Sequence, residues 1–470
     1  MNSLQADTSM EVPARDTKTS LAWIAIAAFL FFLFYPGIMS NDSIQSLKQA
    51  RTLQLTDWHP PVMALVWRAL DSVVSGPVGM LLAQVVLYAF AAARLCAHAF
   101  PNLAQRFSPW LVVACFSLFP PAMAITGMIW KDVWMSGLLL LATSYLFTLS
   151  ASEHDGGGKR VAFAAIVACC LFATAFRHNA LAATAGLLAG AIYFAWRPAK
   201  PVARMLAACI GGVLLAIAMA GAVALFNAAV ARHMQVTTPL LLHDIAGVIV
   251  HSGEPSKAAD LALSTDMHLT SDHETFLSRI QHSYDSGAAG PLVSTSRNRD
   301  TPFAVDVYRS DHDAAGVRNV WKKMVARYPR AYLAHRARAF ACLLQLCGAK
   351  KWISRSYFLN PKYALPATVE PDTWQWRARK IFLSPTLAPL YSPLAWLLVA
   401  LAGACIGLRA LRRPTRVPAL LLFMGLSSVG LALSLVFTSP IESYRYIHWC
   451  VLLGWTMLWM LFDYAMRPRT

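Results

Sequence analysis

Five short polar clusters stand at the ends of apolar segments, and their side chains could together carry out acid–base chemistry and bind an anion. The clusters are Ser40-Asn41-Asp42-Ser43, Asp57-Trp58-His59-Pro60-Pro61, Trp130-Lys131-Asp132, Arg177-His178-Asn179 and Glu442-Ser443-Tyr444-Arg445-Tyr446. A carboxylate can accept a proton, and an arginine or lysine can stabilise a negative charge. Ionisable groups at membrane depth are costly and usually face a cavity or one another. We therefore expect several clusters to contribute to one polar site.

Each cluster also has an ordinary structural explanation when it is taken alone. Asp42 could only cap a short surface helix over Ser43–Leu53, because serine, asparagine and aspartate are common N-cap residues. The second cluster could be an interfacial turn that starts a helix over Val62–Val73. The neighbouring charges of the third cluster could form a local ion pair, the fourth could be plain loop charges, and Arg445 could extend toward the interface. The occurrence of all five clusters on one side of the predicted membrane favours a shared site.

Long apolar runs predict the elements that position these clusters. The chain has 470 residues, of which 57% are hydrophobic and only 14% charged, whereas soluble domains average about 25% charged residues. Each run approaches the roughly 20 residues needed to cross the hydrocarbon core. The predicted spans are Leu21–Ile38, Pro77–Ala97, Pro109–Thr126, Val133–Leu149, Val161–Phe176, Leu181–Trp196, Met205–Val230, Leu387–Leu408, Val417–Phe437 and Ile447–Phe462. The sequence therefore predicts an all-α polytopic membrane protein with about ten spanning helices.

The distribution of basic residues predicts the orientation of the spans. The net charge is +17, and most Lys and Arg residues of the short loops fall on the side of the N-terminus. Because cytoplasmic loops are enriched in Lys and Arg, both termini are expected in the cytoplasm and the five clusters outside it. In a chain this apolar, the positive charge is expected to meet anionic lipid headgroups, and we expect no nucleic-acid partner.

The predicted spans divide the chain into four parts. They are a cytoplasmic tail over 1–20, a transmembrane module over 21–230 with a first outer loop at 39–76, an extracytoplasmic loop domain over 231–386, and a second transmembrane module over 387–470. The loop domain is too long to be a simple connector.

Two features of the predicted loop domain leave alternatives open. Ala315–Leu346 has helical spacing and is divided at Pro329, so it predicts either an amphipathic helix on the membrane surface or an ordinary domain helix. Ser286–Asp300 is expected to be irregular. Cys342 and Cys347 would form a disulfide if this region lies outside the cytoplasm.

Motifs for nucleotide or metal binding are weak. Gly156-Gly157-Gly158-Lys159 lacks the spacing of a phosphate-binding loop and follows no strand, which disfavours an ATP-driven pump. Asp311-His312-Asp313 more often forms a solvated loop than a metal site.

At the five clusters the chain resembles the membrane glycosyltransferases of the C-type fold (GT-C), which include protein mannosyltransferases and aminoarabinose transferases. The resemblance rests on Asp42 directly after the first span, a long first outer loop, polar residues on later outer loops, and a basic residue beside the last span. It covers the architecture of most of the chain. Ser43 stands where the family often has a second carboxylate, so the resemblance does not extend to a pair of carboxylates at this point. Asp42-Ser43 with Trp58-His59-Pro60-Pro61 is more similar to an uncharacterised bacterial subgroup.

The resemblance implies a reaction and a role for each candidate residue. The reaction is inverting transfer of a sugar from a polyprenyl-phosphate carrier to a lipid, glycan or protein acceptor outside the cytoplasm, in the bacterial inner membrane and for the cell envelope. Asp42 would be the base, and His59 and Asp132 would orient the acceptor or help to bind a divalent ion, the only cofactor considered. The implied substrate-binding residues are Trp58, Lys131, Arg177, His178, Asn179, Glu442, Tyr444, Arg445 and Tyr446.

Two other enzyme or transport functions remain as alternatives. A polysaccharide polymerase or O-antigen ligase also has a large outer loop with arginines, but acts on diphosphate-linked glycans. A secondary transporter would need polar or broken helices near the midplane, for which Pro120 and Pro121 are the best indication.

Overall fold

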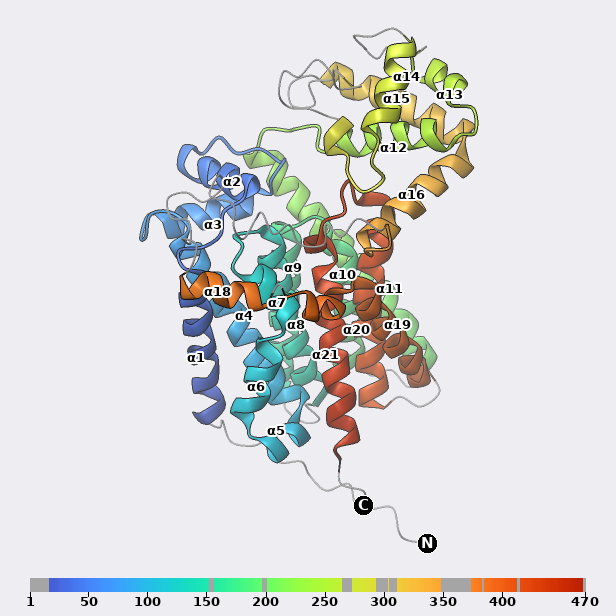
Figure 1. Cartoon of the computed structure of the whole chain (residues 1–470). Coiled ribbons are helices and arrows are strands. Elements are labelled where there is room, and N and C mark those ends of the chain that lie inside the picture. The colour runs from blue at the N-terminus through green and yellow to red at the C-terminus, as the bar shows by residue number, and fades with distance from the viewer. Residues whose placement is uncertain are drawn as a thin grey trace.

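The computed structural model describes most of the chain as helices. The described residues are 17–151, 156–196, 201–263, 273–292, 303, 311–347, 373–382, 384–411 and 415–467. Within these ranges the only β-pairing is four isolated bridges. Figure 1 shows a bundle of long helices that carries a smaller helical group at one end, while the first helix begins and the last helix ends at the opposite end. The expected all-α architecture is confirmed for these residues.

Every apolar segment predicted to span the membrane falls on a helix or a helix pair. The corresponding helices are α1 (Thr17–Phe34), α4 (Val78–Ala99), α6 (Pro109–Ser117) with α7 (Pro120–Thr126), α8 (Lys131–Ala151), α9 (Gly156–Phe176), α10 (Ala180–Ala195), α11 (Pro201–Val230), α19 (Pro393–Gly407), α20 (Arg416–Thr438) and α21 (Tyr444–Ala465). By length and composition, six helices among the described residues could cross a membrane, or seven if the bent pair is one span. The chain is thus a multi-pass membrane protein.

Two helices outside that set of six, α10 and α21, are nevertheless packed inside the bundle. Helix α10 packs so closely on α20 that a Cβ at Gly186 would lie 2.4 Å from the Ser427 nitrogen. Helix α21 includes Arg445 and Asp463, which lower its apolar content. It nevertheless packs against α8, α19 and α20 inside the bundle.

The third predicted span is broken, contrary to the single helix expected over 109–126. Helices α6 and α7 meet at an angle of 64°. Pro120 and Pro121 stand at the start of α7, and proline has no N–H to continue the hydrogen-bond ladder of α6. After α7 the chain runs extended, and Ile38 forms a parallel bridge with Met128. This bridge sets the start of α8 beside the segment that follows α1.

The first outer loop contains two short helices, α2 (Asn41–Thr52) and α3 (Pro61–Asp71), close to the predicted ranges. Ser40 caps α2 and forms a capping box with Ser43. The N-terminus of α2 therefore carries Asp42 in its first turn, where the helix dipole favours a carboxylate.

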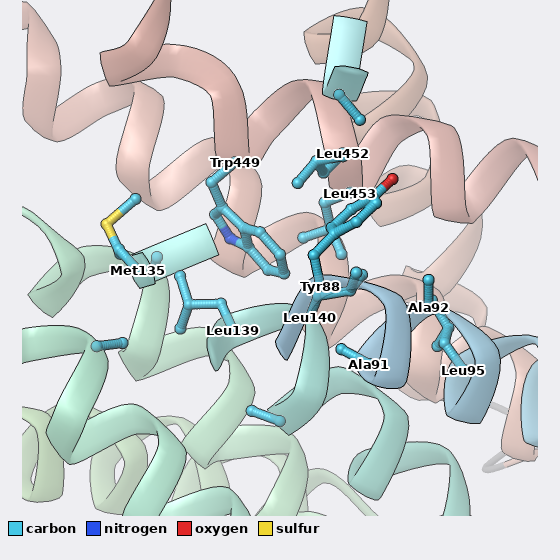
Figure 2. Close-up of a cluster of buried hydrophobic side chains, with 14 of the residues drawn as sticks. Tyr88, Ala91, Ala92, Leu95, Met135, Leu139, Leu140, Trp449, Leu452 and Leu453 are labelled. Atoms are coloured by element: carbon cyan, nitrogen blue, oxygen red, sulfur yellow. The ribbon is translucent and has the colours of Figure 1, made fainter. Parts of the chain in front are cut away.

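The bundle core holds two of the cluster-bearing helices together. Figure 2 shows Tyr88 of α4, Leu139 and Leu140 of α8, and Trp449 and Leu453 of α21 packed against one another. Apolar burial is worth roughly 25 cal/mol per Å², so this contact fixes α8 and α21 side by side. Their N-terminal turns carry Asp132 and Arg445.

A separate hydrophobic core underlies the small helical group, here called the loop domain (residues 238–343). Its helices are α12 (Thr238–His251), α13 (Pro255–Leu263), α14 (His273–Ser283), η1 (Gly290–Leu292), α15 (Asp311–Arg327) and α16 (Pro329–Leu343). The apolar face of α15, with Val317, Val320 and Met324, is fully buried in this core. Of the two interpretations of 315–346, an ordinary domain helix is therefore correct, and the break falls at Pro329 as predicted.

Several features complete the description. Cys342 and Cys347 form a disulfide. Outside the loop domain, four further short elements of the described residues were not predicted from sequence: α5 (Pro101–Phe107), α18 (Trp374–Phe382), η3 (Pro385–Tyr391) and η4 (Leu408–Leu411). The tail up to residue 16, the later part of the expected irregular segment and the side chains of residues 311–313 lie outside the described residues.

Candidate active site

Asp42 and Arg445, which are far apart in the sequence, form an ion pair at the end of the bundle. The Arg445 Nη1 donates to the Asp42 Oδ2 at 2.6 Å. The Asp42 side chain keeps 34% of its surface exposed, whereas Arg445 keeps 12%. Partial burial would raise the pKa of Asp42, but the neighbouring Arg445 holds it well below its ordinary value. Asp42 is thus an accessible and ionised carboxylate.

Asp132 lies beneath this pair and contacts two guanidinium groups. Its Oδ1 is 2.8 Å from Arg177 Nη1, and its Oδ2 is 3.9 Å from Arg445 Nε. Asp132 is fully buried and Arg177 is nearly so. A buried carboxylate that is surrounded by cations acts as their counter-ion, and Asp132 has no exposed surface with which to receive an acceptor.

Aromatic rings border the same cations. The Arg177 guanidinium lies 4.3 Å from the ring centre of Tyr446, and that of Arg445 lies 4.9 Å from Trp130 and 5.3 Å from Tyr446. Such contacts orient a guanidinium without neutralising its charge. Both arginines therefore keep their capacity to bind an anion.

Lys131 adds a third cation, which His59 contacts. The Lys131 Nζ is 3.4 Å from His59 Nδ1, and the other ring nitrogen of His59 is 3.0 Å from Gln45 Oε1. His59 is almost fully buried, and burial together with Lys131 lowers its pKa to about 3. His59 is therefore neutral at physiological pH.

Side-chain hydrogen bonds tie the starts of α2 and α8 together. The Trp130 indole donates to Ser40 Oγ at 2.7 Å, and Ser43 Oγ donates to the Ile129 carbonyl at 2.8 Å. Ser43 thus has a structural role where the resembling family often has a carboxylate. These bonds hold the two carboxylate-bearing turns in a fixed relation.

Some predicted site residues lie at the edge of this cluster or away from it. Tyr444 packs against Tyr391 and His448, at ring distances of 6.1 Å. Glu442 faces the loop domain, because a Cβ at Gly287 would lie 2.5 Å from its Oε2. Tyr444 thus lies in an aromatic group beside the site, and Glu442 lies at the border with the loop domain.

The remaining predicted residues are neighbours in sequence of members of the cluster. His178 follows Arg177 and is exposed, and desolvation of its ring, together with Lys131 and Arg177, lowers its pKa. Asn179 is the N-cap of α10 without a side-chain capping bond. Trp58 is half-buried on the turn before His59.

Two backbone bridges join the loop domain and its leading segment to the surroundings of the site. Thr56 pairs with Arg232, and Ala288 pairs with Ile441, four residues before Arg445. Asp57 accepts from His233 Nδ1 at 2.7 Å and from the Met234 backbone N–H at 2.6 Å. Asp57 therefore anchors the segment that leads from α11 into the loop domain.

A second cluster of buried charge lies inside the loop domain. Asp244 Oδ2 accepts from Arg336 Nη2 at 2.7 Å and from the Trp321 indole at 2.8 Å, and Asp244 Oδ1 is 3.2 Å from His335 Nε2. His335 Nδ1 lies 2.8 Å from the Tyr284 hydroxyl. Arg336 also donates to the Ser439 carbonyl at 3.2 Å, which links this cluster to the segment before α21.

The donor set of the candidate site does not fit a divalent metal. Among the described residues no group of three or more His, Cys, Asp or Glu side chains could hold a metal ion. The two carboxylates of the site are both bound to guanidinium groups, and hard cations need several oxygen ligands. No step below is therefore assigned to a metal.

Comparison with known proteins gives structural similarity only. No family model matches the chain, and no curated protein matches it in sequence. Two solved structures of ArnT from Cupriavidus metallidurans are similar to this chain. The structure bound to undecaprenyl phosphate has 12% sequence identity and a TM-score of 0.33, and the match covers 94% of this chain and 78% of that chain. The structure in the apo state has 14% sequence identity and a TM-score of 0.32, and the match covers 91% of this chain and 78% of that chain. At these TM-scores the similarity carries no further argument about fold or activity.

Proposed function

We propose that this protein is an inverting membrane glycosyltransferase that moves a sugar from a polyprenyl-phosphate carrier to an acceptor hydroxyl. The observation that supports it most is the convergence of one accessible carboxylate with three cations from separate helices. Asp42 comes from α2, Lys131 from α8, Arg445 from α21, and Arg177 from the turn after α9. This combination provides a base beside an anion-binding group.

The cations would bind the phosphate that leaves the sugar. Arg177 and Arg445 present planar guanidinium groups suited to phosphate oxygens, and Lys131 adds a compact charge. Negative charge on the phosphate grows as the bond between the sugar C1 and the phosphate oxygen breaks. Fixed cations in a largely buried site stabilise that charge most strongly.

Asp42 would accept the proton of the acceptor hydroxyl as its oxygen forms the new bond to C1. In the resting protein the pairing with Arg445 makes Asp42 a weak base. A donor phosphate competes with Asp42 for Arg445, and as that pairing weakens, the basicity of Asp42 rises. Binding of the donor thus prepares the base for the reaction.

The balance of charge favours a monophosphate-linked donor over the diphosphate-linked alternative. Lys131, Arg177 and Arg445 outnumber Asp42 and Asp132 by one positive charge, while His59 is neutral. A sugar phosphodiester carries one negative charge. After transfer, the protonated Asp42 leaves a second positive charge unbalanced, and the released phosphate monoester gains a second negative charge. A diphosphate would exceed this balance at both stages.

The broken span formed by α6 and α7 does not favour the transporter alternative over the glycosyltransferase. The described residues of α7 are Pro120-Pro121-Ala122-Met123-Ala124-Ile125-Thr126, and none of them is ionisable. A transport site at a helix break needs groups that bind the substrate. Here the break instead positions the start of α8 for the cluster.

The reaction would occur on the membrane face opposite the cytoplasm, in a bacterial inner membrane. The loop domain lies at the same end of the bundle as α2 (Figure 1) and contains the Cys342–Cys347 disulfide, and disulfides persist mainly in oxidising compartments. This placement agrees with the orientation predicted from the Lys and Arg residues.

A transfer assay with the purified protein in liposomes would test the proposal. The donors are hexoses and pentoses linked to undecaprenyl phosphate or undecaprenyl diphosphate, with a lipid extract as the acceptor source. We expect release of undecaprenyl phosphate with inverted configuration at the transferred sugar. Turnover only with diphosphate donors would favour the polymerase or ligase function, and the absence of binding to either lipid would contradict both.

A further inference from the structure

The Lys131 ammonium is connected to α2 through two side chains that the proposed reaction does not use. Gln45 of α2 contacts His59 at 3.0 Å, and His59 contacts Lys131 at 3.4 Å. His59 is 3% exposed, so water has little access to its ring. Gln45 is exposed and Lys131 is half-buried, so the buried His59 ring connects a surface side chain to a cation of the site. A buried imidazole needs hydrogen-bond partners for both of its nitrogens, and these two contacts supply them.

The chemistry of the three groups fixes the position of each proton. A lysine ammonium only donates hydrogen bonds, so the facing Nδ1 of His59 must accept. A neutral imidazole has one donor and one acceptor, and therefore Nε2 carries the proton and donates to the Gln45 oxygen. A protonated His59 would place two positive charges 3.4 Å apart in a buried site, which is unfavourable.

We propose that Gln45 and His59 are positioning residues: Gln45 holds the His59 ring with its proton on Nε2, and the unprotonated Nδ1 holds Lys131 where the donor phosphate binds. This inference rests on the proposed function for the identity of the anion. It assigns His59 a role through Lys131, in place of the direct role in acceptor or metal binding that the sequence suggested.

The position of Gln45 in α2 explains why one short helix controls both sides of the cluster. Asp42 and Gln45 are three residues apart, so they lie on one face of α2. Asp42 reaches Arg445, while Gln45 reaches Lys131 through His59. The spacing of the two cations is therefore set by a single rigid element that Ser40 caps.

Binding of undecaprenyl phosphate to the full-length protein in nanodiscs tests the inference. His59→Leu should weaken affinity about tenfold, the loss expected for one hydrogen bond to a charged group. Gln45→Leu should weaken affinity by about threefold to tenfold, because its bond to His59 joins two neutral groups. His59→Asn should restore affinity, because its amide oxygen can accept from Lys131. The matched control is Gln49→Leu, one turn further along α2, where Gln49 bonds to Thr56 at 3.1 Å and holds the same loop. Gln49→Leu should leave affinity unchanged.

Nitrogen-15 NMR of labelled histidine provides a readout that does not depend on the reaction. At neutral pH, His59 should show one protonated nitrogen, Nε2, and one unprotonated nitrogen, Nδ1. Gln45→Leu should disturb this pattern, and Lys131→Met should shift the Nδ1 signal. A protonated ring, or a proton on Nδ1, would overturn the inference.

The two measurements separate failure of the inference from failure of the proposed function. If Lys131→Met loses affinity but His59→Leu and Gln45→Leu do not, the positioning role is wrong while the proposed function stands. If the wild-type protein does not bind undecaprenyl phosphate, the proposed function and the identity of the bound anion are both wrong. The NMR signals that depend on Lys131 would then confirm or refute the Gln45–His59–Lys131 arrangement by themselves.

Discussion

Two clusters in this molecule each pair aspartate with arginine, but they differ in exposure to solvent and in the balance of charge. In the loop domain, Asp244 accepts hydrogen bonds from Arg336 and Trp321 and lies beside His335. Arg336 also donates to the Ser439 carbonyl. At the end of the bundle, three cations face two carboxylates, and one carboxylate, Asp42, remains one-third exposed.

This difference teaches that accessibility and unbalanced charge separate a reactive site from a structural one, while burial alone does not. Asp244 is fully buried among its partners, so it can stabilise its surroundings but offers no surface to a ligand. A cluster with an excess of positive charge gains stability when an anion binds to it. The predictions below test whether the two clusters differ in this way.

The largest effect is expected for Asp42→Asn. The substitution removes the proposed base, so the transfer rate should fall about a thousandfold, within the usual range for general-base loss. Because Arg445 loses its anionic partner, affinity for undecaprenyl phosphate should be retained or increased. Steady-state rates and lipid binding of the same preparation check both parts. An asparagine variant with near wild-type turnover would remove Asp42 as the base.

In the loop domain, Asp244→Asn should change stability and leave lipid affinity unaltered. It leaves Arg336 buried with its charge uncompensated, which costs about 3 kcal/mol. Thermal unfolding in detergent measures the loss, and Glu254→Gln is the control, because the Glu254–Lys257 pair is exposed and should contribute nothing measurable. Weaker lipid binding in Asp244→Asn would mean that the two clusters are coupled.

Arg445→Ala and Arg177→Ala should weaken binding of undecaprenyl phosphate by about tenfold or more each. The effect of Arg445→Ala should be larger, because Arg445 is close to both carboxylates and its loss leaves Asp42 unpaired. Arg51→Ala provides the control, since Arg51 pairs with Asp71 on the surface of the same outer loop. Equal affinity in all three variants would refute the phosphate role.

The smallest effect is expected for pH: affinity for the lipid should change little between about pH 7 and pH 5. The pKa of His59 lies near 3 in the folded protein, below its ordinary 6.5, so the neutral ring persists as the pH falls through 6.5. The unfolded chain binds this proton below about 6.5, and hence His59 makes folding less favourable as the pH drops from there toward 3.

Binding of a phosphodiester lipid, whose charge does not change in this range, measures the pH effect on the site. A change in affinity, in either direction, with a midpoint near 6.5 that disappears in His59→Asn would show that His59 titrates normally, and would contradict a neutral His59.

Hydropathy predicted the bundle well, because spans of apolar residues report directly on a membrane environment. It failed at 109–126, where average hydropathy is insensitive to the two prolines that break the helix. The loop-domain helices α12 to α14 were not predicted, since their packing partners are distant in sequence. The helix break at Pro329 was predicted, because proline acts locally.

The sequence identified most charges of the site but not their partners. Pairing of Asp42 with Arg445 and of Asp132 with Arg177 depends on the packing of separate helices, which spacing along the chain does not reveal. Tyr444 and Tyr446 could have been separated, because residues two apart in a helix point to different sides. Gln45 could have been found by the same reasoning from Asp42.

The backbone bridges Thr56–Arg232 and Ala288–Ile441 have a consequence for engineering. They connect the loop domain and the segment leading into it to both sides of the candidate site. Exchanging only the loop domain between related proteins would therefore break these contacts. A chimera that keeps both bridged pairs of segments from one parent should retain turnover, whereas one that mixes them should misplace Arg445, four residues after Ile441. The loop domain is therefore exchangeable as a module only together with the two segments that it bridges.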